Sequence, residues 1–330
     1  MRPYPLKFYE IYKPKVWGGR KIETVLGKHM PEGPIGESWE LSDHFDDVSI
    51  VRNGPLEGRS LREIWHCDPE GVLGTCLASR DYGEFPLLVK FIDAAQWLSV
   101  QVHPDDEYAR LYGEGESGKE EAWYVIDAAE GARLVAGLRE GTTREQFRHL
   151  LEEGRIEECL HYVDVKAGDI VHVSAGTVHS IGPGILLCEI QETSDATYRV
   201  WDWGRVGLDG RSRPLHIDKA IDVIRFESTP AGKACPDVLQ EAAPRREMLT
   251  TCRHFRIEKL ESREPFELEP VEGSFQVLVS IHATATVVCE GERYVLGRAD
   301  TMLLPAALPS ARVEPEGALV LLRAFVSSEG

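Results

Sequence analysis

The sequence predicts a mainly β fold, an antiparallel sandwich or barrel with helical inserts near the N-terminal half. Apolar and polar residues alternate with period two in many short segments, which is typical of strands with one buried face. The strand–helix–strand rhythm of a parallel sheet is missing from the chain. Helical spacing is confined to three segments. Together these observations favour an antiparallel β architecture.

The strands are expected where the alternation is clearest. Residues 36–44 predict a strand that ends in a polar loop, within an N-terminal region punctuated by Gly and Pro. Further strands are predicted at 85–94, 97–103, 122–127, 132–138, 161–165, 168–176, 184–192 and 197–203. Strands resume at 252–260 and continue to the C-terminus.

The helices are expected in three inserts. Leucine, isoleucine and tryptophan recur at helical spacing within 60–74. Thr142 and Glu145 have the spacing of a capping box ahead of an apolar helix face in 142–154. Residues 214–226 predict the third helix.

The chain is long enough for more than one compact core. Its 330 residues are 42% hydrophobic and 28% charged, as in ordinary globular proteins. A stretch rich in Pro, Ala and charge at 227–246 is typical of a linker. We therefore expect an N-terminal domain over 1–226, which includes the helical inserts, and a C-terminal domain over 247–330.

Charge and composition exclude several partners. The net charge of −18 repels phosphate backbones and anionic lipids, so neither nucleic acid nor a membrane surface is an expected partner. The seven cysteines are scattered and form no C-x-x-C pair, which argues against a disulfide framework or a thiolate zinc site. No apolar run reaches signal-peptide or membrane-spanning length. The sequence therefore predicts a cytoplasmic protein.

A weak internal repeat relates the two halves of the chain. Residues 168–180 resemble residues 299–311 when Asp169 is aligned with Asp300. This alignment places His179 opposite Ser310. Both halves are thus expected to use one β unit, with a metal-binding type of residue at this position in the first half only.

Polar side chains share one face of the segment "WLSVQVHPDD". Alternation along a strand places its Ser, Gln and His together, opposite an apolar face. Two glutamates begin the strand predicted at 122–127, and a histidine lies in a Gly-punctuated turn between two apolar strands. Such nitrogen and oxygen donors suit a borderline divalent ion such as zinc. The candidate ligands are Gln101, His103, one of Glu120 and Glu121, and His179.

Ligand types leave the metal open, because two histidines and a carboxylate also bind iron in non-haem oxygenases. His172, in "IVHVS", is a rival ligand that we interpret as a strand residue satisfied by a neighbour. A solvent-exposed polar strand face is the alternative interpretation of "SVQVH".

Charged residues inside apolar strands indicate an enclosed site. Partial burial of Glu189 would raise its pKa, as a general base requires, and a salt bridge is the alternative role. Lys90 needs a counter-ion or a ligand, and Asp93 is one possible counter-ion. Arg199 and Arg205 share parity with two tryptophans, and arginine binds phosphate through paired hydrogen bonds. These groups suit a small, phosphorylated, oxygen-rich substrate.

These segments resemble the type I mannose-6-phosphate isomerases, zinc-dependent cupin enzymes, in their short bacterial form. The resemblance runs from "YKPKVWGGRKIE" through "LSVQVHPDD" and "GKEEAWYVIDA" to "GTVHS", "DWGR" and "RPLHIDKAIDVI". It implies two cupin-type, jelly-roll-like β-barrels, of which the first is catalytic and the second is metal-free.

The resemblance also assigns site residues. It implies one Zn²⁺ per chain, held by Gln101, His103, Glu121 and His179, with Glu120 in the variable place of "GKEE". It places Glu189, Arg199 and Lys90 among the catalytic residues, with Glu189 as the expected base. It associates four more residues with substrate binding: Ser99, Lys119, Asp195 and Arg205.

The implied reaction interconverts D-mannose 6-phosphate and D-fructose 6-phosphate through a cis-enediol. The expected partner is accordingly a small-molecule sugar phosphate, and the expected state is a monomer or a weak homo-oligomer. Two alternatives stay open. One is a cupin dioxygenase that holds Fe(II) with the same ligands, and the other is a sugar-phosphate-binding cupin without catalysis.

Overall fold

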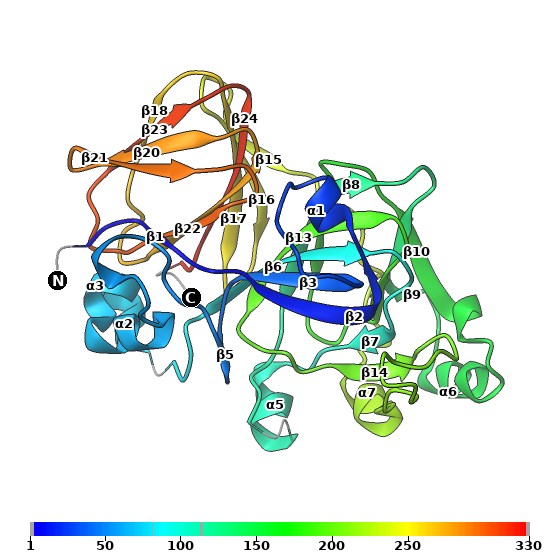
Figure 1. Cartoon of the computed structure of the whole chain (residues 1–330). Coiled ribbons are helices and arrows are strands. Elements are labelled where there is room, and N and C mark those ends of the chain that lie inside the picture. The colour runs from blue at the N-terminus through cyan, green and yellow to red at the C-terminus, as the bar shows by residue number, and fades with distance from the viewer. Residues whose placement is uncertain (1–2, 81, 113–114, 328–330) are drawn as a thin grey trace.

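The fold is mainly β, as the sequence predicted, and its sheets are arranged in two halves (Figure 1). The structure, a computed structural model, describes residues 3–80, 82–112 and 115–327. The N-terminal half carries the candidate site, and the C-terminal half packs against one of its sheets.

Two sheets face each other in the N-terminal half. The six-stranded sheet has the order β11 (Ile170–Val173), β8 (Glu121–Ala128), β13 (Ile185–Glu192), β6 (Leu87–Ala94), β2 (Ile11–Gly19) and β3 (Ile35–Leu41). The five-stranded sheet has the order β10 (Leu160–Asp164), β9 (Arg133–Leu138), β12 (His179–Ile181), β7 (Val100–Val102) and β14 (Tyr198–Trp201). One apolar cluster includes Ile92 and Val125 of the first sheet and Leu134 of the second, so the two sheets enclose a common core.

The C-terminal half repeats this arrangement with its own pair of sheets. The seven-stranded sheet has the order β1 (Leu6–Lys7), β22 (Thr301–Leu304), β19 (Gln276–His282), β24 (Leu319–Phe325), β17 (Arg256–Ser262), β16 (Arg245–Thr251) and β15 (Asp237–Gln240). The four-stranded sheet has the order β18 (Phe266–Leu268), β23 (Ala311–Pro315), β20 (Ala285–Cys289) and β21 (Glu292–Leu296). Leu278 and Val287 belong to the core between them.

Strands β6 and β13 are buried on both faces. One face of each strand looks into the N-terminal half, and the other joins Phe91 and Cys188 to Val277 and Leu322 of the C-terminal half in the largest core cluster. Their sequences are therefore nearly continuous apolar runs, as in other strands covered on both sides. Lys90 and Glu189 are exceptions in these runs.

Short helices flank the sheets. They are α1 (Lys21–Thr24), α2 (Leu61–Cys67), α3 (Pro69–Leu73), α4 (Thr75–Ala78), α5 (Asp106–Tyr112), α6 (Arg144–Glu152) and α7 (Ile217–Val223), with 3₁₀ turns at Gly54–Leu56 and Ile156–Cys159. The three predicted inserts are confirmed: α2 and α3 form the first, α6 the second and α7 the third, whereas α4 lies just beyond the first predicted range. Helix α5 was not predicted, because it is short and buries only Ala109 among its described residues.

The capping prediction for α6 was wrong by one residue. Thr143 is the N-cap: its hydroxyl accepts a hydrogen bond from the Gln146 backbone N–H at 3.2 Å, and the Gln146 side chain accepts one from the Thr143 N–H at 3.0 Å. The Thr142 hydroxyl instead donates to the Arg139 carbonyl at 2.7 Å. The turn after β9 thus uses Thr142, and the helix begins later.

The connections between the halves are not confined to one linker. Strand β1, from the N-terminal end, pairs with β22 of the C-terminal half. Strand β15 lies within the expected linker at 227–246 and pairs with β16. The boundaries at 226 and 247 stay predictions, and the chain crosses between the halves at its N-terminal end as well.

The two members of the internal repeat form the same turn. Asp169 accepts a hydrogen bond from the Lys166 backbone N–H at 2.9 Å, and Asp300 accepts one from the Gly297 N–H at 2.8 Å. Each aspartate directly precedes a strand, β11 and β22 respectively. This shared local geometry supports the alignment of the two halves.

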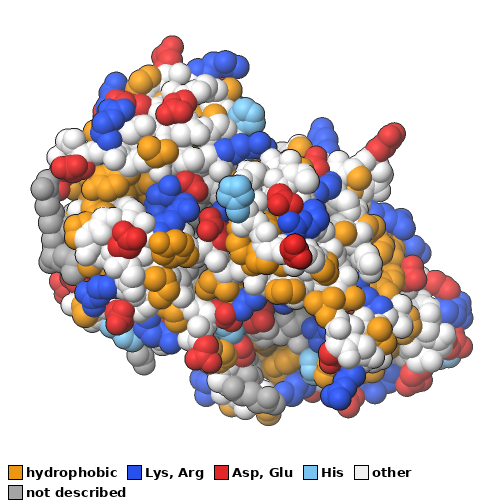
Figure 2. All heavy atoms as spheres, in the orientation of Figure 1, with side chains coloured by type: hydrophobic (Ala, Val, Ile, Leu, Met, Phe, Trp, Pro, Cys, Tyr) orange, Lys and Arg blue, Asp and Glu red, His pale blue; other side chains and the backbone are white. Residues whose placement is uncertain are grey.

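The surface carries both signs of charge. Acidic and basic side chains are interspersed over the face shown in Figure 2. Among the described residues, no helix combines the length and the apolar character that crossing a bilayer would need.

Candidate metal centre and substrate cavity

Three donors predicted from separate segments meet inside the N-terminal half. His103 directly follows β7, Glu121 opens β8 and His179 opens β12. The Nε2 atom of His103 lies 3.3 Å from Glu121 Oε2, and that of His179 lies 3.4 Å from Glu121 Oε1. All three side chains are almost completely buried. Suitable ligand atoms of the three residues lie within 4.8 Å of one another.

Gln101 joins this group through strand pairing. His179 is its direct partner between β12 and β7, and the Gln101 Nε2 lies 3.2 Å from His179 Nε2. Ser99 donates a hydrogen bond to Gln101 Oε1 at 2.9 Å. The alternating polar face of β7 thus points into the protein interior, and the solvent-exposed interpretation of that face is wrong.

The two histidines are oriented by backbone carbonyls. His103 Nδ1 lies 2.5 Å from the Ala196 carbonyl oxygen and His179 Nδ1 lies 2.9 Å from that of Thr177, so both Nδ1 atoms act as donors. Each Nε2 atom therefore carries a lone pair, and this lone pair points toward Glu121. Burial lowers the pKa of His179 to about 3, and burial together with the Lys119 charge lowers the pKa of His103. Both rings are therefore neutral at pH 7, the state that binds metals.

Unpartnered donor atoms at this centre fit a cation. His103 Nε2 and Glu121 Oε1 are buried and have no hydrogen-bond partner among the described residues. Leaving buried polar atoms unpaired is costly, and coordination of a divalent ion would satisfy them. Lys119 Nζ lies 2.9 Å from Glu121 Oε2. Although burial opposes ionisation, this ammonium group holds the pKa of Glu121 well below its usual range.

The centre opens into a polar cavity of about 230 Å³. Its lining brings together most of the predicted site residues with several others, namely Lys15, Trp17, Glu37, Lys90, Ile92, Leu98, Ser99, Gln101, Lys119, Glu121, Trp123, His179, Ser180, Ile181, Glu189, Asp195, Thr197, Arg199, Arg213 and His216. His103 lies behind this lining, against Glu121. Arg205 is absent from the lining.

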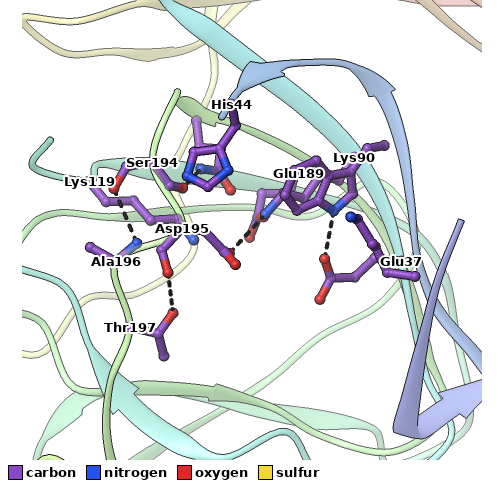
Figure 3. A network of polar contacts seen from close by, with 12 residues as sticks. Glu37, His44, Lys90, Lys119, Glu189, Ser194, Asp195, Ala196 and Thr197 are labelled. Atoms are coloured by element: carbon purple, nitrogen blue, oxygen red, sulfur yellow. Dashed lines mark hydrogen bonds and ion pairs between the residues drawn. The ribbon is translucent and has the colours of Figure 1, made fainter. Parts of the chain in front are cut away.

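Lys90 and two carboxylates form the charged wall of the cavity (Figure 3). Lys90 Nζ lies 3.6 Å from Glu189 Oε1 and 3.8 Å from Asp195 Oδ1, and it packs over the Trp39 ring at 4.6 Å. Asp93 is not the counter-ion of Lys90. The Glu189 carboxylate accepts a hydrogen bond from Trp123 Nε1 at 2.8 Å. Burial, with a smaller contribution from the Glu121 charge, raises the pKa of Glu189 to about 7.

The two predicted arginines have different surroundings. Arg199 lines the cavity, where its Nε donates to Ser99 Oγ at 3.2 Å. Arg205 instead donates to Asp202 Oδ1 through Nε at 3.0 Å and Nη2 at 2.7 Å. The shared parity was a wrong inference, because β14 ends at Trp201 and Trp203 has a φ of +59°, which breaks the alternation.

Three charged residues of the lining, Lys15, Glu37 and Arg213, were not predicted from the sequence. Arg213 lies at the cavity, hydrogen-bonded to Asp202 at 2.8 Å, and Lys15 pairs with Glu37 at 2.9 Å. Arg213 and Lys15 lie in "RPLHID" and "YKPKVW", two of the segments that carry the family resemblance. Those segments were the available signal, but neither has a periodic pattern that points to a site.

Comparison with known proteins agrees with the resemblance. Residues 6–136 match the family described as phosphomannose isomerase type I, catalytic domain. The chain is 36% identical over 327 residues to the mannose-6-phosphate isomerase ManA of Bacillus subtilis, covering 95% of this chain and 97% of the relative. It is 38% identical over 297 residues to the mannose-6-phosphate isomerase of Streptococcus mutans, covering 90% of each chain.

A solved structure has the same fold along nearly the whole chain. The crystal structure of the mannose 6-phosphate isomerase from Bacillus subtilis superposes with a TM-score of 0.89 at 30% identity, covering 97% of this chain and 99% of the other. The fold and the buried donors define the class of the protein: a mainly β protein of cupin type with a candidate metal centre in its N-terminal half. The chain belongs to the type I phosphomannose isomerase family and is an enzyme.

Proposed function

We propose that this enzyme interconverts D-mannose 6-phosphate and D-fructose 6-phosphate with one catalytic Zn²⁺ per chain, held by Gln101, His103, Glu121 and His179. The observation that carries the proposal is the buried group of donors with unpartnered atoms, placed beside a charged cavity. The names of the relatives supply the substrate. Neutral imidazoles, a carboxylate and an amide suit zinc, and they leave room for substrate oxygens.

Glu189 is the proposed base of the isomerisation. Its carboxylate takes the proton from C2 of the aldose and returns it to C1, while one proton moves from O2 to O1, so that the aldose becomes the ketose through a cis-enediol. A bound Zn²⁺ supplies electrostatic stabilisation of the charge that develops on the two oxygens. A carboxylate with a pKa near 7 is suited to both directions of proton transfer at neutral pH.

Lys90 and Lys119 support this chemistry from opposite sides. Lys90, 3.6 Å from Glu189, can donate hydrogen bonds to substrate hydroxyls and stabilises the ionised base. Lys119 compensates the charge of Glu121 at 2.9 Å and thus helps to keep this proposed ligand ionised. We assign Ser99 and Asp195 to substrate hydroxyls, because both line the cavity.

Arg199 is the proposed phosphate ligand. No carboxylate among the described residues lies within ion-pair distance of it, whereas Arg213 pairs with Asp202 and Lys15 pairs with Glu37. Its guanidinium can therefore bind a phosphate without breaking an existing ion pair. We propose Arg213 as a second contact and give Arg205 a positioning role, since it holds the same Asp202.

An assay of mannose 6-phosphate conversion tests the proposal. Fructose 6-phosphate formation would be followed with purified protein, after chelation, and after addition of zinc or iron separately. Activity that is lost with the metal and restored by zinc supports the proposal. Oxygen consumption with iron alone would favour the dioxygenase alternative. Tight binding of mannose 6-phosphate without turnover would indicate a binding protein.

Cellular location and assembly stay predictions from the sequence. We expect a cytoplasmic monomer or weak homo-oligomer, and the only expected partner is the sugar phosphate. Size-exclusion chromatography across a range of protein concentrations would test the predicted assembly.

A further inference from the structure

A second group of metal-binding side chains lies where the two halves meet. Glu120, His172 and Cys252 each offer a ligand atom, and these atoms lie within 4.8 Å of one another. None of the three belongs to the cavity lining or to the proposed reaction. Their chemistry is distinct from that of the first centre, because one donor is a thiol.

Strand geometry separates this group from the first centre. Glu120 directly precedes Glu121, and successive residues of a strand point to opposite faces. His172 of β11 pairs with Ala122 of β8, so its side chain emerges on the same outer face as that of Glu120. Cys252 comes from the other half, in the tight turn between β16 and β17. The three donors therefore bridge the interface of the halves.

The histidine of this group has an unsatisfied donor or acceptor. The Nε2 atom of His172 is buried and has no hydrogen-bond partner among the described residues, although Glu120 Oε2 lies 3.5 Å away. The imidazole of His172 also packs edge-on against the ring of the fully buried Phe255, with ring centroids 6.3 Å apart. A ring packed on one side, with a free nitrogen beside a carboxylate, is a suitable ligand.

The cysteine lies in a turn that is suited to hold a sulfur ligand. The Phe255 backbone N–H points to Cys252 Sγ at an N-to-S distance of 3.4 Å, and Cys252 N–H donates to the Phe255 carbonyl at 3.0 Å. Backbone N–H groups directed at sulfur stabilise the thiolate form. A metal ion would supply the remaining stabilisation that a buried thiolate requires.

Neighbouring contacts hold the two sides together. Glu192 accepts a hydrogen bond from the Glu120 backbone N–H at 2.9 Å, and its other oxygen lies 2.7 Å from Nδ1 of His254. His254, two residues after Cys252, thus attaches this turn to the N-terminal half. This fixed interface reduces the ordering cost of closing a metal site across it.

We propose that Glu120, His172 and Cys252 bind a second divalent cation of borderline softness, Zn²⁺ in the first instance, which links the two halves of the protein. Carboxylate oxygen, imidazole nitrogen and thiolate sulfur form such sites, and water can complete the tetrahedron. On binding, the Cys252 thiol loses its proton to solvent as the sulfur–metal bond forms. The site stabilises the fold and takes no part in the isomerisation.

Cobalt(II) substitution tests the proposal with a readout that is specific to sulfur. Metal-free protein would be titrated with Co²⁺ while the near-ultraviolet charge-transfer band of a cobalt–thiolate bond is recorded. The first centre has no sulfur ligand, so it cannot give this band. We expect the band in the wild-type protein and in His179→Gln, and its loss in Cys252→Ser and His172→Gln. Cys235→Ser, which removes an exposed thiol, is the matched control and keeps the band.

Two outcomes would overturn the proposal: a wild-type protein without the band, or a band that persists in Cys252→Ser. Circular dichroism establishes that each variant is folded. A second measurement needs no variant. In the wild-type protein, added Zn²⁺ should protect Cys252, identified by peptide mass, from alkylation. Equal alkylation of Cys252 with and without saturating Zn²⁺ would also contradict the second site. This result does not depend on whether the isomerase activity is found.

Discussion

At the scale of single residues, Glu189, the proposed base, shows how a group suited to catalysis can work against stability. The residue is 3% exposed and lies on a strand whose other residues are mostly apolar. Burying a carboxylate favours its neutral form, and the nearby ammonium groups of Lys119 and Lys90 only partly compensate. The raised pKa that results makes Glu189 unfavourable as an ion in the folded state. The same property suits Glu189 to its proposed role as the base.

Replacing Glu189 with glutamine should separate catalysis from metal binding. Glu189→Gln removes the base, so kcat should fall roughly 10²- to 10⁴-fold. Zinc content should be unchanged, because the ligands lie on other residues. Its melting temperature at pH 8 should equal or exceed that of the wild type, since the variant no longer buries an ion. Glu258→Gln, at another buried carboxylate in the C-terminal half, should keep kcat and serves as the control. Unaltered turnover in Glu189→Gln would exclude it as the base.

The pH dependence of kcat should follow the same residue. The pKa of Glu189 is raised to about 7 in the folded protein, so its carboxylate form is lost as the pH falls through that value. A bound cation favours the carboxylate, so the midpoint in the zinc-loaded enzyme should lie below 7. Measurement of kcat between pH 5 and pH 9 would locate this midpoint, and each unit by which it lies below 7 corresponds to about 1.4 kcal/mol. Activity that rises toward acid pH would contradict this assignment.

At the scale of structural elements, the centre depends on where strands begin and end. β8 and β12 each start with a proposed metal ligand, and β7 is followed by one. The segment after β13 adds the carbonyl of Ala196, which orients His103. Ser194 shapes that segment: its hydroxyl accepts from the Ala196 N–H at 3.2 Å and donates to the Ser117 carbonyl at 2.9 Å.

Ser194→Ala should weaken metal binding without changing the chemistry. The substitution removes two hydrogen bonds that anchor the segment carrying the Ala196 carbonyl, so the orientation of His103 becomes less defined. Loss of an outer contact of this kind costs roughly 10-fold in metal affinity. Competition with a chelator would measure the change, and turnover per bound zinc should stay the same. Ser280→Ala, at a buried serine that caps a turn in the C-terminal half, should leave affinity unchanged.

At the scale of the whole molecule, the N-terminal segment joins the two halves. Strand β1 pairs with β22, and Asp300 lies between Lys7 and Arg52, accepting from Lys7 Nζ at 2.5 Å and from Arg52 Nη2 at 2.7 Å. Burial opposes ionisation of Asp300, but these two cations and the Gly297 N–H lower its pKa. Asp300 is also the repeat counterpart of Asp169.

Asp300→Asn should destabilise the protein without affecting the reaction. The substitution leaves two partly buried cations without their carboxylate, at a cost of about 1–3 kcal/mol in the free energy of unfolding. Because the pKa of Asp300 is lowered on folding, the wild-type advantage is present at neutral pH and is lost as the pH falls through that lowered pKa. Denaturant unfolding at pH 7 and pH 3 would measure this. An unchanged midpoint at pH 7, or a changed kcat, would contradict the assignment.

Much of the architecture and of the first centre was predictable because the relevant signals are local. Period-two alternation predicts most strands of the N-terminal half and the shared face that carries Ser99, Gln101 and His103. The residue types of Glu121 and His179, with the family resemblance, complete the donor set. Charged residues within apolar runs, such as Lys90 and Glu189, could be recognised as exceptions because burying a charge is costly.

Relations between segments that are distant in the sequence became visible only in the folded protein. Alternation cannot be followed past the end of a strand. The turn at Trp203 therefore had to be known before one could see that Arg213, and not Arg205, lines the cavity. Likewise, a spacing rule for thiolate sites cannot find Cys252, whose neighbours Glu120 and His172 lie on the other half of the molecule. From the amino-acid sequence alone one can derive most of the strands and the types of donor that are available. Packing decided which of these donors meet, because only the register and contact of the sheets bring distant residues within coordination distance.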